Sequence, residues 1–473
     1  MALTDITHDT TTPETRLRVA YIMSRFPKLT ETFVLYEILA MEAHDVDVAI
    51  YPLLRERPGI IHEEARQLVA RANYTPLISL PIVSANLRRL LRQPRAYLGA
   101  LRDVVRGAWG SLRFLAGGLA FFPKAVYMAQ RMEQEGIRHI HAHFANHPAA
   151  VAFIIHRLSG IPYSFTAHGS DIHRDQHMLR EKVAAAAFVV PISVANRDFI
   201  LEHIDSGNSN TAHTYAGKMV VIHCGVDMDQ FASHFPSPNG HSAPTGDGPG
   251  HAEGDGLSHA KGMEPPSSTA PLTAQGAGPA ATGLSAEPFH ILCIGTLHEV
   301  KGQTYLIAAV EQLRRQEIDV HCHFVGGGPD LPRLQQQVDE LGLGARVHFH
   351  GEQRRSQVLD HLRRADVLVL PSVPSSDGRR EGIPVSLMEG MAAGLPVVAS
   401  RLSGIPELVE DGQTGLLADP RDVDGLATAL ARLHRSAPLR RRLGQAGRQK
   451  VLAEFNLNEN ARQLADQIRE ALA

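Results

Sequence analysis

"EGIPVSLMEGMAAGLPVVAS", residues 381–400, reads as a loop, a helix and a buried strand in succession. Pro384 suits a first helical turn because proline has no N–H to leave unpaired there. Gly394 ends the helix, and the apolar residues that follow it predict a buried strand. The stretch therefore predicts a unit of parallel α/β structure that carries two carboxylates, Glu381 before the helix and Glu389 inside it.

The same alternation of short apolar runs and helical segments continues along the chain in both directions. Apolar runs without a polar face are typical of parallel strands that helices cover on both sides. The expected strands are 18–23, 45–50, 139–144, 163–168, 188–193 and 219–224, and then 289–295, 320–326, 346–351, 367–372 and 396–400. We therefore predict two facing, doubly wound α/β domains, whose ligands bind at the carboxyl ends of the strands in an interdomain cleft.

A segment of different composition separates the two groups of strands. Residues 236–287 contain eight prolines and ten glycines, and no Ile, Val, Phe, Tyr or Trp. Such a segment cannot bury enough apolar surface to offset its ordering entropy, which predicts a disordered linker or insertion. The expected organisation is a disordered tail, two domains around the linker and a terminal helix, with bounds 1–15, 16–235, 236–287, 288–454 and 455–473.

Composition narrows the class of protein. A formal net charge of -3 argues against a nucleic-acid partner, and three cysteines provide no disulfide framework. The polar start "MALTDITHDTTTPETRLR" has no apolar signal core, and the apolar run at 114–122 is too short to span a bilayer. We therefore expect a cytoplasmic protein without a transmembrane helix.

One region is strongly basic. Residues 84–131 contain nine Lys or Arg and one acid, Asp103, which gives 9 − 1 = +8, and leucines recur beside the arginines at helical spacing. A basic amphipathic helix can lie on an anionic membrane surface, here the inner face of the cytoplasmic membrane. The alternative is a helix that packs on its own domain and leaves a solvated charged face.

Three loops at the carboxyl ends of the later strands offer chemistry suited to a diphosphate. Lys301 supplies a cation, and Gly326-Gly327-Gly328 form a turn where backbone can approach a ligand. The helix start after Glu381 has free N–H groups that favour an anion. Glu381 would then point past the phosphates toward sugar hydroxyls, and Glu389 could accept hydrogen bonds from a vicinal diol such as a ribose. The alternative is that both glutamates are solvated surface residues.

Several stretches resemble the family-4 retaining glycosyltransferases. These are 381–400 with "SGIPELVEDGQTGLL" (403–417), "VIHCGVDMDQF" (221–231) and "IGTLHEVKGQTYLIAAV" (294–310). Three further stretches resemble the branch that builds exopolysaccharides such as colanic acid: "YIMSRFPKLTETFVLYEI" (21–38), "HIHAHFANHPA" (139–149) and "SFTAHGSDIH" (164–173). The resemblance implies the GT-B architecture, with two facing Rossmann-like domains and a last helix that crosses back to the first.

The resemblance also implies an activity: transfer of a hexose from a nucleotide diphosphate sugar to a glycan hydroxyl, with retention and usually without a metal or other cofactor. By this resemblance Glu389 binds the ribose, Glu381 and His168 contact the transferred sugar, and Lys301 contacts the diphosphate. Catalysis would then depend on Glu381, His168 and Lys301. The other implied donor contacts are Gly295, Thr296, Gly326, Gly327, Gly328, Arg379, Arg380, Gly382, Ile383 and Pro384.

The donor loop departs from the family pattern at one position. The family usually has an arginine after the glycine of the donor loop, and here Thr296 follows Gly295; a threonine cannot make the bidentate phosphate contact of an arginine. Arg379 or Arg380 could take that role; alternatively the enzyme is slow, or its donor sits differently.

The acceptor, a glycan that is expected to be lipid-linked, would contact Arg25, Lys28, Glu31, His143 and Asp171. Arg25, Lys28 and Glu31 are expected in the loop after the first strand. The alternative to acceptor recognition is that this is an ordinary connecting loop in which Thr30 caps the next helix.

The 26 histidines invite a metal interpretation. His139, His141 and His143 would share one face of a strand, as ligands in a metallohydrolase do. We favour the alternative that they line or support an acceptor cleft, and we expect no metal. Two other functions stay open: a nucleotide-sugar epimerase of the same architecture, and a non-catalytic partner subunit of a transferase, which the Thr296 departure would favour.

Overall fold

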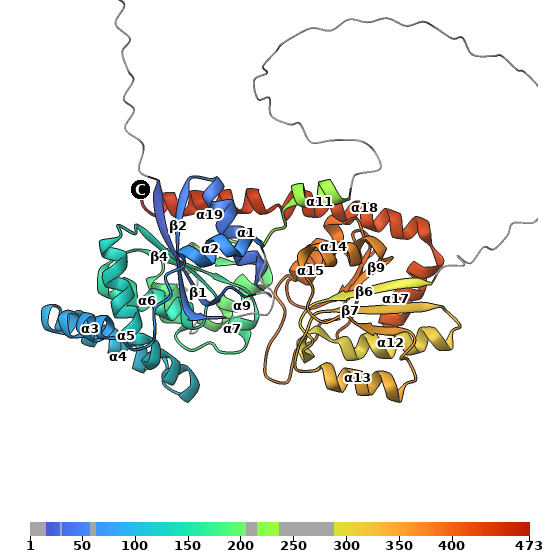
Figure 1. Cartoon of the computed structure of the whole chain (residues 1–473), viewed down its shortest axis with the longest axis horizontal. Coiled ribbons are helices and arrows are strands. Elements are labelled where there is room, and N and C mark those ends of the chain that lie inside the picture. Colours follow the sequence, from blue (N-terminus) through green and yellow to red (C-terminus); the bar gives the residue numbers. More distant parts are fainter. Residues whose placement is uncertain (1–15, 29–30, 57–62, 205–214, 236–287) are drawn as a thin grey trace, which may run out of the picture. The chain divides into compact units, whose positions relative to one another are not determined.

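The computed structural model describes residues 16–28, 31–56, 63–204, 215–235 and 288–473. The expected tail 1–15 and linker 236–287, together with Thr30, lie outside these residues. The described residues contain two parallel sheets, each with its own helices, which we call the first and second lobes (Figure 1).

The first lobe is built on a five-stranded sheet with the order β2-β1-β3-β4-β5, in which every pair is parallel. Its strands are β1 (Leu17–Phe26), β2 (Val46–Arg55), β3 (His139–His143), β4 (Tyr163–Ala167) and β5 (Phe188–Pro191). Its helices are α1 (Thr32–Ala43), α2 (Glu63–Arg71), α3 (Leu80–Arg92), α4 (Pro94–Gly107), α5 (Leu112–Gln134), α6 (His147–Ser159), α7 (Ser170–His173), α8 (Leu179–Ala185) and α9 (Val194–Ile204).

The second lobe is built on a six-stranded sheet with the order β11-β10-β9-β6-β7-β8, also parallel. Its strands are β6 (Phe289–Ile294), β7 (Val320–Val325), β8 (Val347–Phe349), β9 (Val367–Leu370), β10 (Val397–Ser400) and β11 (Leu416–Ala418). Its helices are the short 3-10 helix η1 (Glu299–Lys301), α12 (Gln303–Arg315), α13 (Leu331–Glu340), α14 (Arg355–Arg364), α15 (Val385–Ala392), α16 (Ile405–Leu408), α17 (Val423–Arg435) and α18 (Ala437–Glu454).

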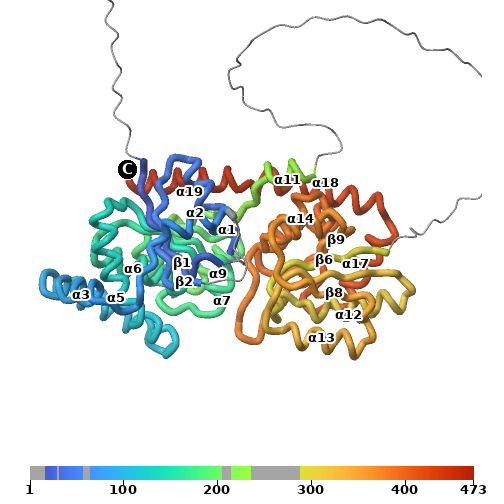
Figure 2. The backbone as a smooth tube through the Cα atoms, viewed as in Figure 1, coloured from blue at the N-terminus to red at the C-terminus, as the bar shows by residue number. Residues whose placement is uncertain are grey.

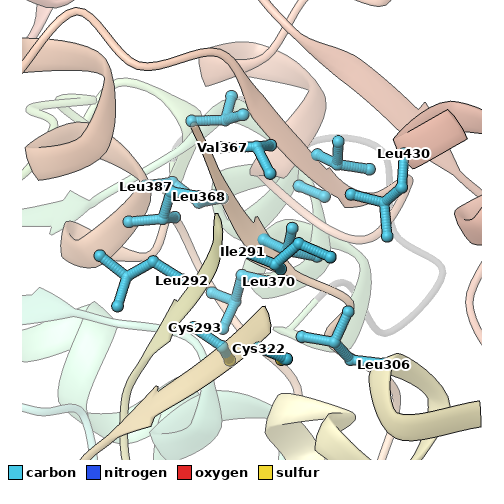
Figure 3. Close-up of a cluster of buried hydrophobic side chains, with 14 of the residues drawn as sticks. Ile291, Leu292, Cys293, Leu306, Cys322, Val367, Leu368, Leu370, Leu387 and Leu430 are labelled. Atoms are coloured by element: carbon cyan, nitrogen blue, oxygen red, sulfur yellow. The ribbon is translucent and has the colours of Figure 1, made fainter. Parts of the chain in front are cut away.

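Helices cover both faces of the second sheet, which explains why its strands are continuous apolar runs. Figure 3 shows part of this core, where Ile291 and Cys322, register partners on β6 and β7, lie among leucines of β9, α12 and α17. Pairing across adjacent parallel strands brings the carboxyl ends of β6, β7 and β9 to one edge. The predicted fold class, two doubly wound α/β lobes, is confirmed.

Three expectations need correction. Residues 219–224 form no strand; Met219 makes only an isolated bridge to Val189. The strand β11 was not expected, because its three residues give too short an apolar run. The first domain was expected to extend to residue 235, but α11 (Met228–His234) buries Met228 and Phe231 in the core of the second lobe.

The last helix, α19 (Leu457–Glu470), packs on the first lobe. Its buried apolar side chains belong to the same cluster as residues of β1, β2 and α1; they are Leu457, Ala461, Leu464, Ala465 and Ile468. Asn460 donates a hydrogen bond to the carbonyl of His223, and Arg469 donates one to the carbonyl of His44. The chain thus passes from the first lobe to the second and returns (Figure 2).

Candidate functional site

The cation and the carboxylate expected at the donor site lie next to each other. Lys301 ends η1, which follows β6, and Glu381 lies in the loop between β9 and α15. The Nζ atom of Lys301 is 2.9 Å from Oε1 of Glu381, and both side chains are mostly buried. Because β6 and β9 are neighbours, the sheet itself brings these two loops together.

The helix after Glu381 begins one residue later than expected. Pro384 is the N-cap of α15, with extended backbone, and Val385 is its first helical residue. The preceding Gly382 and Ile383 are buried, and Gly394 ends the segment with a φ of 81°.

The glycines of the donor loops are required by the packing of one loop on another. A Cβ atom on Gly326 would lie 2.1 Å from the carbonyl oxygen of Gly295, and one on Gly328 would lie 2.2 Å from that of Leu297. Gly295 and Gly326 also have φ values of 153° and 138°, which side chains rarely allow. The atoms nearest to a Cβ atom on Gly327 would belong to the side chain of Glu352. The loops after β6 and β7 therefore form one compact backbone surface beside Lys301.

Glu389 does not stand alone in α15. Its carboxylate forms an ion pair with Arg355, the first residue of α14. Arg355 also donates hydrogen bonds of 3.1 and 3.0 Å to Oε1 of Gln230 on α11, and its guanidinium lies over the ring of Phe231. Sequence reasoning missed Arg355; its signal is the basic pair that follows the loop after β8.

The two arginines proposed to replace the missing donor-loop arginine have different positions. Nη1 of Arg379 lies 3.1 Å from Nε2 of His298, two residues after Thr296, and its Nε lies 3.1 Å from Asp377. Arg379 therefore contacts the donor loop. Arg380 is exposed, and its charge lies close enough to His173 to assist burial in lowering the pKa of that histidine to about 4.

Backbone of the first lobe touches the second lobe at Gly382. A Cβ atom on Gly382 would lie 2.2 Å from the carbonyl oxygen of His168, and one on Gly169 would lie 2.7 Å from the amide nitrogen of Gly382. The hydroxyl of Ser170 donates a 3.0 Å hydrogen bond to the carbonyl of Arg380. His168 is thus adjacent to the loop that carries Glu381.

A chain of polar side chains runs behind His168. Its Nε2 lies 3.2 Å from Nδ1 of His143, and Nε2 of His143 lies 3.2 Å from Oε1 of Glu37. The hydroxyl of Tyr21 donates to the same Glu37 oxygen at 3.0 Å. Burial, followed by the neighbouring His143, lowers the pKa of His168 well below its usual value. His168 is therefore a neutral imidazole near pH 7, and the contact of its Nε2 with His143 holds the ring in place.

The metal site that was weighed as the alternative for the strand histidines can be compared with this arrangement. Glu37, His141 and His143 are the group of described residues whose ligand atoms lie within 4.8 Å of one another. Both ring nitrogens of His141 are already within hydrogen-bonding distance of hydroxyls, 2.8 Å from Ser164 and 2.9 Å from Thr166. An ion here would have to displace one of these contacts, so the residues fit a hydrogen-bonded support better than a metal centre.

The expected acceptor residues lie on several elements of the first lobe: β1, the start of α1, β3 and α7. Arg25 is the penultimate residue of β1 and not a loop residue as expected, because β1 extends to Phe26. Lys28 and Glu31 form an ion pair, and Glu31 is the N-cap of α1 without a side-chain cap hydrogen bond. Asp171 is buried, and its carboxylate accepts hydrogen bonds from the backbone N–H groups of Ala145, His168 and Gly169. Asp171 therefore holds the loop around His168, and its oxygens are occupied.

A second contact between the lobes was not anticipated. The carboxylate of Glu407, in α16, accepts hydrogen bonds of 2.8 and 2.9 Å from the N–H groups of Val194 and Ala195 at the start of α9. A carboxylate at a helix N-terminus satisfies unpaired donors and complements the helix dipole. The second lobe thus caps a helix of the first.

Two parallel-sheet lobes with a cation, a carboxylate and glycine loops where they meet define the fold class of two-lobed glycosyltransferases. Solved structures share this architecture. Anabaena Alr3699/HepE in complex with UDP and glucose has a TM-score of 0.64 at 18% identity, covering 95% of this chain and 99% of that chain. A glycosyltransferase from Rickettsia africae has a TM-score of 0.63 at 15% identity and covers 96% of this chain and 98% of that chain.

Residues 278–450, which include most of the second lobe, match the family model of glycosyl transferases group 1. The family resemblance inferred from the motifs is thereby confirmed for this lobe. The chain is 38% identical over 180 residues to a protein named as a colanic acid biosynthesis glycosyltransferase, WcaL, of Salmonella typhimurium, covering 38% of this chain and 44% of the relative. It is also 38% identical over 187 residues to the amylovoran biosynthesis glycosyltransferase AmsK of Erwinia amylovora, covering 40% and 46%. Each match spans less than half of the relative's length.

Proposed function

We propose that this chain is a retaining glycosyltransferase of exopolysaccharide biosynthesis that moves a hexose from a nucleotide diphosphate sugar to a hydroxyl of a glycan. The observation that carries the proposal is the placement of Lys301 beside Glu381, with their atoms 2.9 Å apart at the edge where β6 and β9 end. The names of the relatives support the pathway, and the group 1 family supports the reaction class.

In the proposed donor complex, Lys301, the N-terminus of α15 and Arg379 face the diphosphate. Positive charge fixed in place before the reaction stabilises the charge that develops on the leaving group. Glu381 accepts hydrogen bonds from the hydroxyls of the transferred sugar, and Glu389 accepts them from the ribose. In the structure each of the two glutamates is paired with a cation, which holds its side chain in place.

Retention is proposed to follow from attack on the same face of the sugar. The acceptor oxygen forms the new bond to the anomeric carbon as the bond from that carbon to the diphosphate breaks. The acceptor proton passes to an oxygen of the departing diphosphate, so no protein nucleophile is required. His168, neutral and supported by His143, orients the sugar. The configuration of the product, measured by NMR on the anomeric proton, tests this step.

Peripheral contact with an anionic membrane is proposed for α3 and α4. No described helix is long and apolar enough to cross a bilayer. The expected single basic helix is three helices, and Lys124 of α5 is buried and donates to backbone carbonyls of β2, so it leaves the basic surface. The remaining surface still combines exposed leucines with exposed arginines: Leu80, Leu87, Leu91 and Leu98, with Arg88, Arg92, Arg95, Arg102 and Arg106.

Each of the two alternatives considered from the sequence is supported by one side of this surface. One side of α4 packs on the first lobe through Ala100 and Val104, as a structural helix does. The other side leaves Leu98 exposed, and Leu80 and Leu91 of α3 are 86% and 73% exposed. Apolar side chains among arginines suit the headgroup region of an anionic membrane, where a lipid-linked acceptor would be presented.

Titration of the full chain with UDP-, GDP- and ADP-sugars by calorimetry tests the donor site. We expect one donor class to bind, and the Glu389→Gln variant to bind it about tenfold more weakly or worse, since an anionic acceptor of two hydrogen bonds is lost. A thermal melt of the variant must show that it is folded. Binding without product on any glycan acceptor, with an altered free sugar nucleotide instead, would replace transfer by epimerisation. No binding across the panel would favour the partner-subunit function.

A further inference from the structure

A turn of the second lobe contacts the first lobe through charged side chains. The turn consists of residues 375–379, in the loop between β9 and α15. Oδ2 of Asp377 lies 3.4 Å from Nη2 of Arg174, the residue that follows α7, and 3.1 Å from Nε of Arg379. We call Arg174 and Arg379 the arginine pair. One carboxylate oxygen therefore serves two guanidinium groups, one from each lobe.

The guanidinium of Arg174 is only partly used by this contact. Within the described parts of the chain its side chain donates no hydrogen bond, and its ion pair with Asp377 is the one ion pair that it forms. A guanidinium has five N–H donors in a fixed fork. The side chain is 30% exposed, so an incoming anion can reach donors that the protein leaves unused.

Arginines gather around this contact. Burial, and then the charges of Arg113 and Arg379, lower the pKa of Arg174, whereas the charges of Asp377 and Asp175 raise it. Arginine stays charged at neutral pH, so these neighbouring arginines repel one another. An anion that carries more than one charge would relieve this repulsion better than the single carboxylate that now lies between the arginine pair.

The turn is joined to the short helix that carries Lys301. Oε2 of Glu299, the first residue of η1, accepts hydrogen bonds from the N–H and the hydroxyl of Ser376 at 3.0 and 2.6 Å. Arg379 contacts His298, the N-cap of η1, and Lys301 is the last residue of that helix. The arginine pair therefore lies next to the loop that is proposed to hold the donor diphosphate.

We infer that Arg174 is a diphosphate-binding residue contributed by the first lobe, and that the carboxylate of Asp377 stands where a phosphate oxygen of the donor binds. The ion pair is easily broken because about a third of each side chain is exposed. A diphosphate displaces the carboxylate, since it carries more charge and arginine can bind it through two parallel hydrogen bonds. Arg174 then supplies the cation that Thr296 cannot. The inference rests on the proposed donor site and adds a residue to it.

Calorimetry of the full chain with UDP, GDP and ADP tests the inference. For the nucleotide that binds, Arg174→Gln should weaken binding by about thirtyfold, because charged hydrogen bonds to phosphate are lost. Asp377→Asn should tighten binding by about threefold, because its side chain keeps its shape and no longer competes for the arginine pair. Arg180→Gln, which removes an exposed arginine of α8, is the matched control and should bind the nucleotide as the unmodified chain does.

The opposite signs separate a phosphate contact from a purely structural ion pair, because breaking such a pair from either side would change nucleotide binding in the same direction. Thermal melts establish that each variant is folded, and Arg174→Lys serves if Arg174→Gln is not. The inference alone is overturned if a nucleotide binds and Arg174→Gln binds it as tightly as the unmodified chain, or if Asp377→Asn binds it more weakly. A chain that binds none of the three nucleotides would overturn both the inference and the proposed donor site.

Discussion

Lys301 and Glu381 form an ion pair, with Nζ of the lysine 2.9 Å from Oε1 of the glutamate and 18% and 13% of the two side chains exposed. The sequence suggested that a carboxylate beside a diphosphate must point away from it. In the proposed donor complex, the carboxylate and the diphosphate would share this one lysine, which would offset the repulsion between them.

Replacing Glu381 by glutamine should separate catalysis from nucleotide binding. Glutamine keeps the shape but releases Lys301, so a nucleoside diphosphate should bind at least as tightly as to the unmodified chain. The transfer rate should fall by about a hundredfold or more, because the hydrogen bonds to the transferred sugar lose their charge. Product formation and calorimetry measure the two quantities, with Glu340→Gln on α13 as the matched control. An unchanged rate would remove Glu381 from the site.

The pair formed by Glu389 and Arg355 should contribute to stability. Only 13% and 17% of these side chains are exposed, so loss of one partner leaves a poorly solvated charge. We expect a double-mutant cycle of Glu389→Gln and Arg355→Met, followed by urea unfolding, to give a coupling of about 1–3 kcal/mol. Additive single effects would show that the two side chains do not interact in solution.

Glu37 should make stability depend on pH. Burial alone would raise its pKa, but the charge and hydrogen bond of His143, together with His141 and the hydrogen bond from Tyr21, outweigh burial and lower the pKa below the usual 4.5. A lowered pKa in the folded state stabilises the protein above that value, and this contribution is lost as the pH falls through the folded pKa. The difference in unfolding free energy between the unmodified chain and Glu37→Gln should therefore shrink below pH 4.5. A difference that is constant with pH would contradict the contact with His143.

Membrane contact should require both kinds of side chain on α3 and α4. Vesicles with an anionic lipid should sediment the full chain, and neutral vesicles should not. Leu80→Ser/Leu91→Ser and Arg88→Gln/Arg92→Gln should each reduce the bound fraction, and only the second should reduce the salt dependence of binding. Leu452→Ser, an exposed leucine of α18, is the control. Equal binding to both kinds of vesicle would exclude the electrostatic part of the proposal.

Glu407 should couple the two lobes. Its carboxylate accepts from two N–H groups at the start of α9, and Glu407→Ala leaves both donors without this partner. We expect a loss of about 1 kcal/mol in unfolding free energy and faster hydrogen exchange at Val194 and Ala195. Unchanged exchange at these two amides, with the rest of α9 protected, would show that the cap forms only transiently.

The sequence predicted the elements that depend on local pattern. Apolar runs located ten of the eleven strands, and the stretch around Glu381 and Glu389 predicted its loop, helix and strand. The partner of Glu389 was not predictable, since Arg355 is 34 residues away in the sequence. The contact of Glu407 with α9 was not predictable either, since Glu407 is 213 residues from Val194. The residue types at 219–224 resemble a strand, yet the sheet ends at β5 with a single bridge there. Contacts of this kind follow from topology, which single-sequence patterns do not contain.

The return of α19 to the first lobe decides how the protein can be divided. A fragment that stops at residue 235 would lack Leu457, Leu464 and Ile468 of α19, which are part of the apolar core of the first lobe. A fragment that starts at residue 288 would carry an apolar helix with nothing to cover and would lack Met228 and Phe231 from its core. Cutting the chain between its two lobes would therefore yield two fragments that expose apolar surface and tend to aggregate. A stable first lobe would need residues 457–470, either supplied as a peptide or fused to it by a new loop.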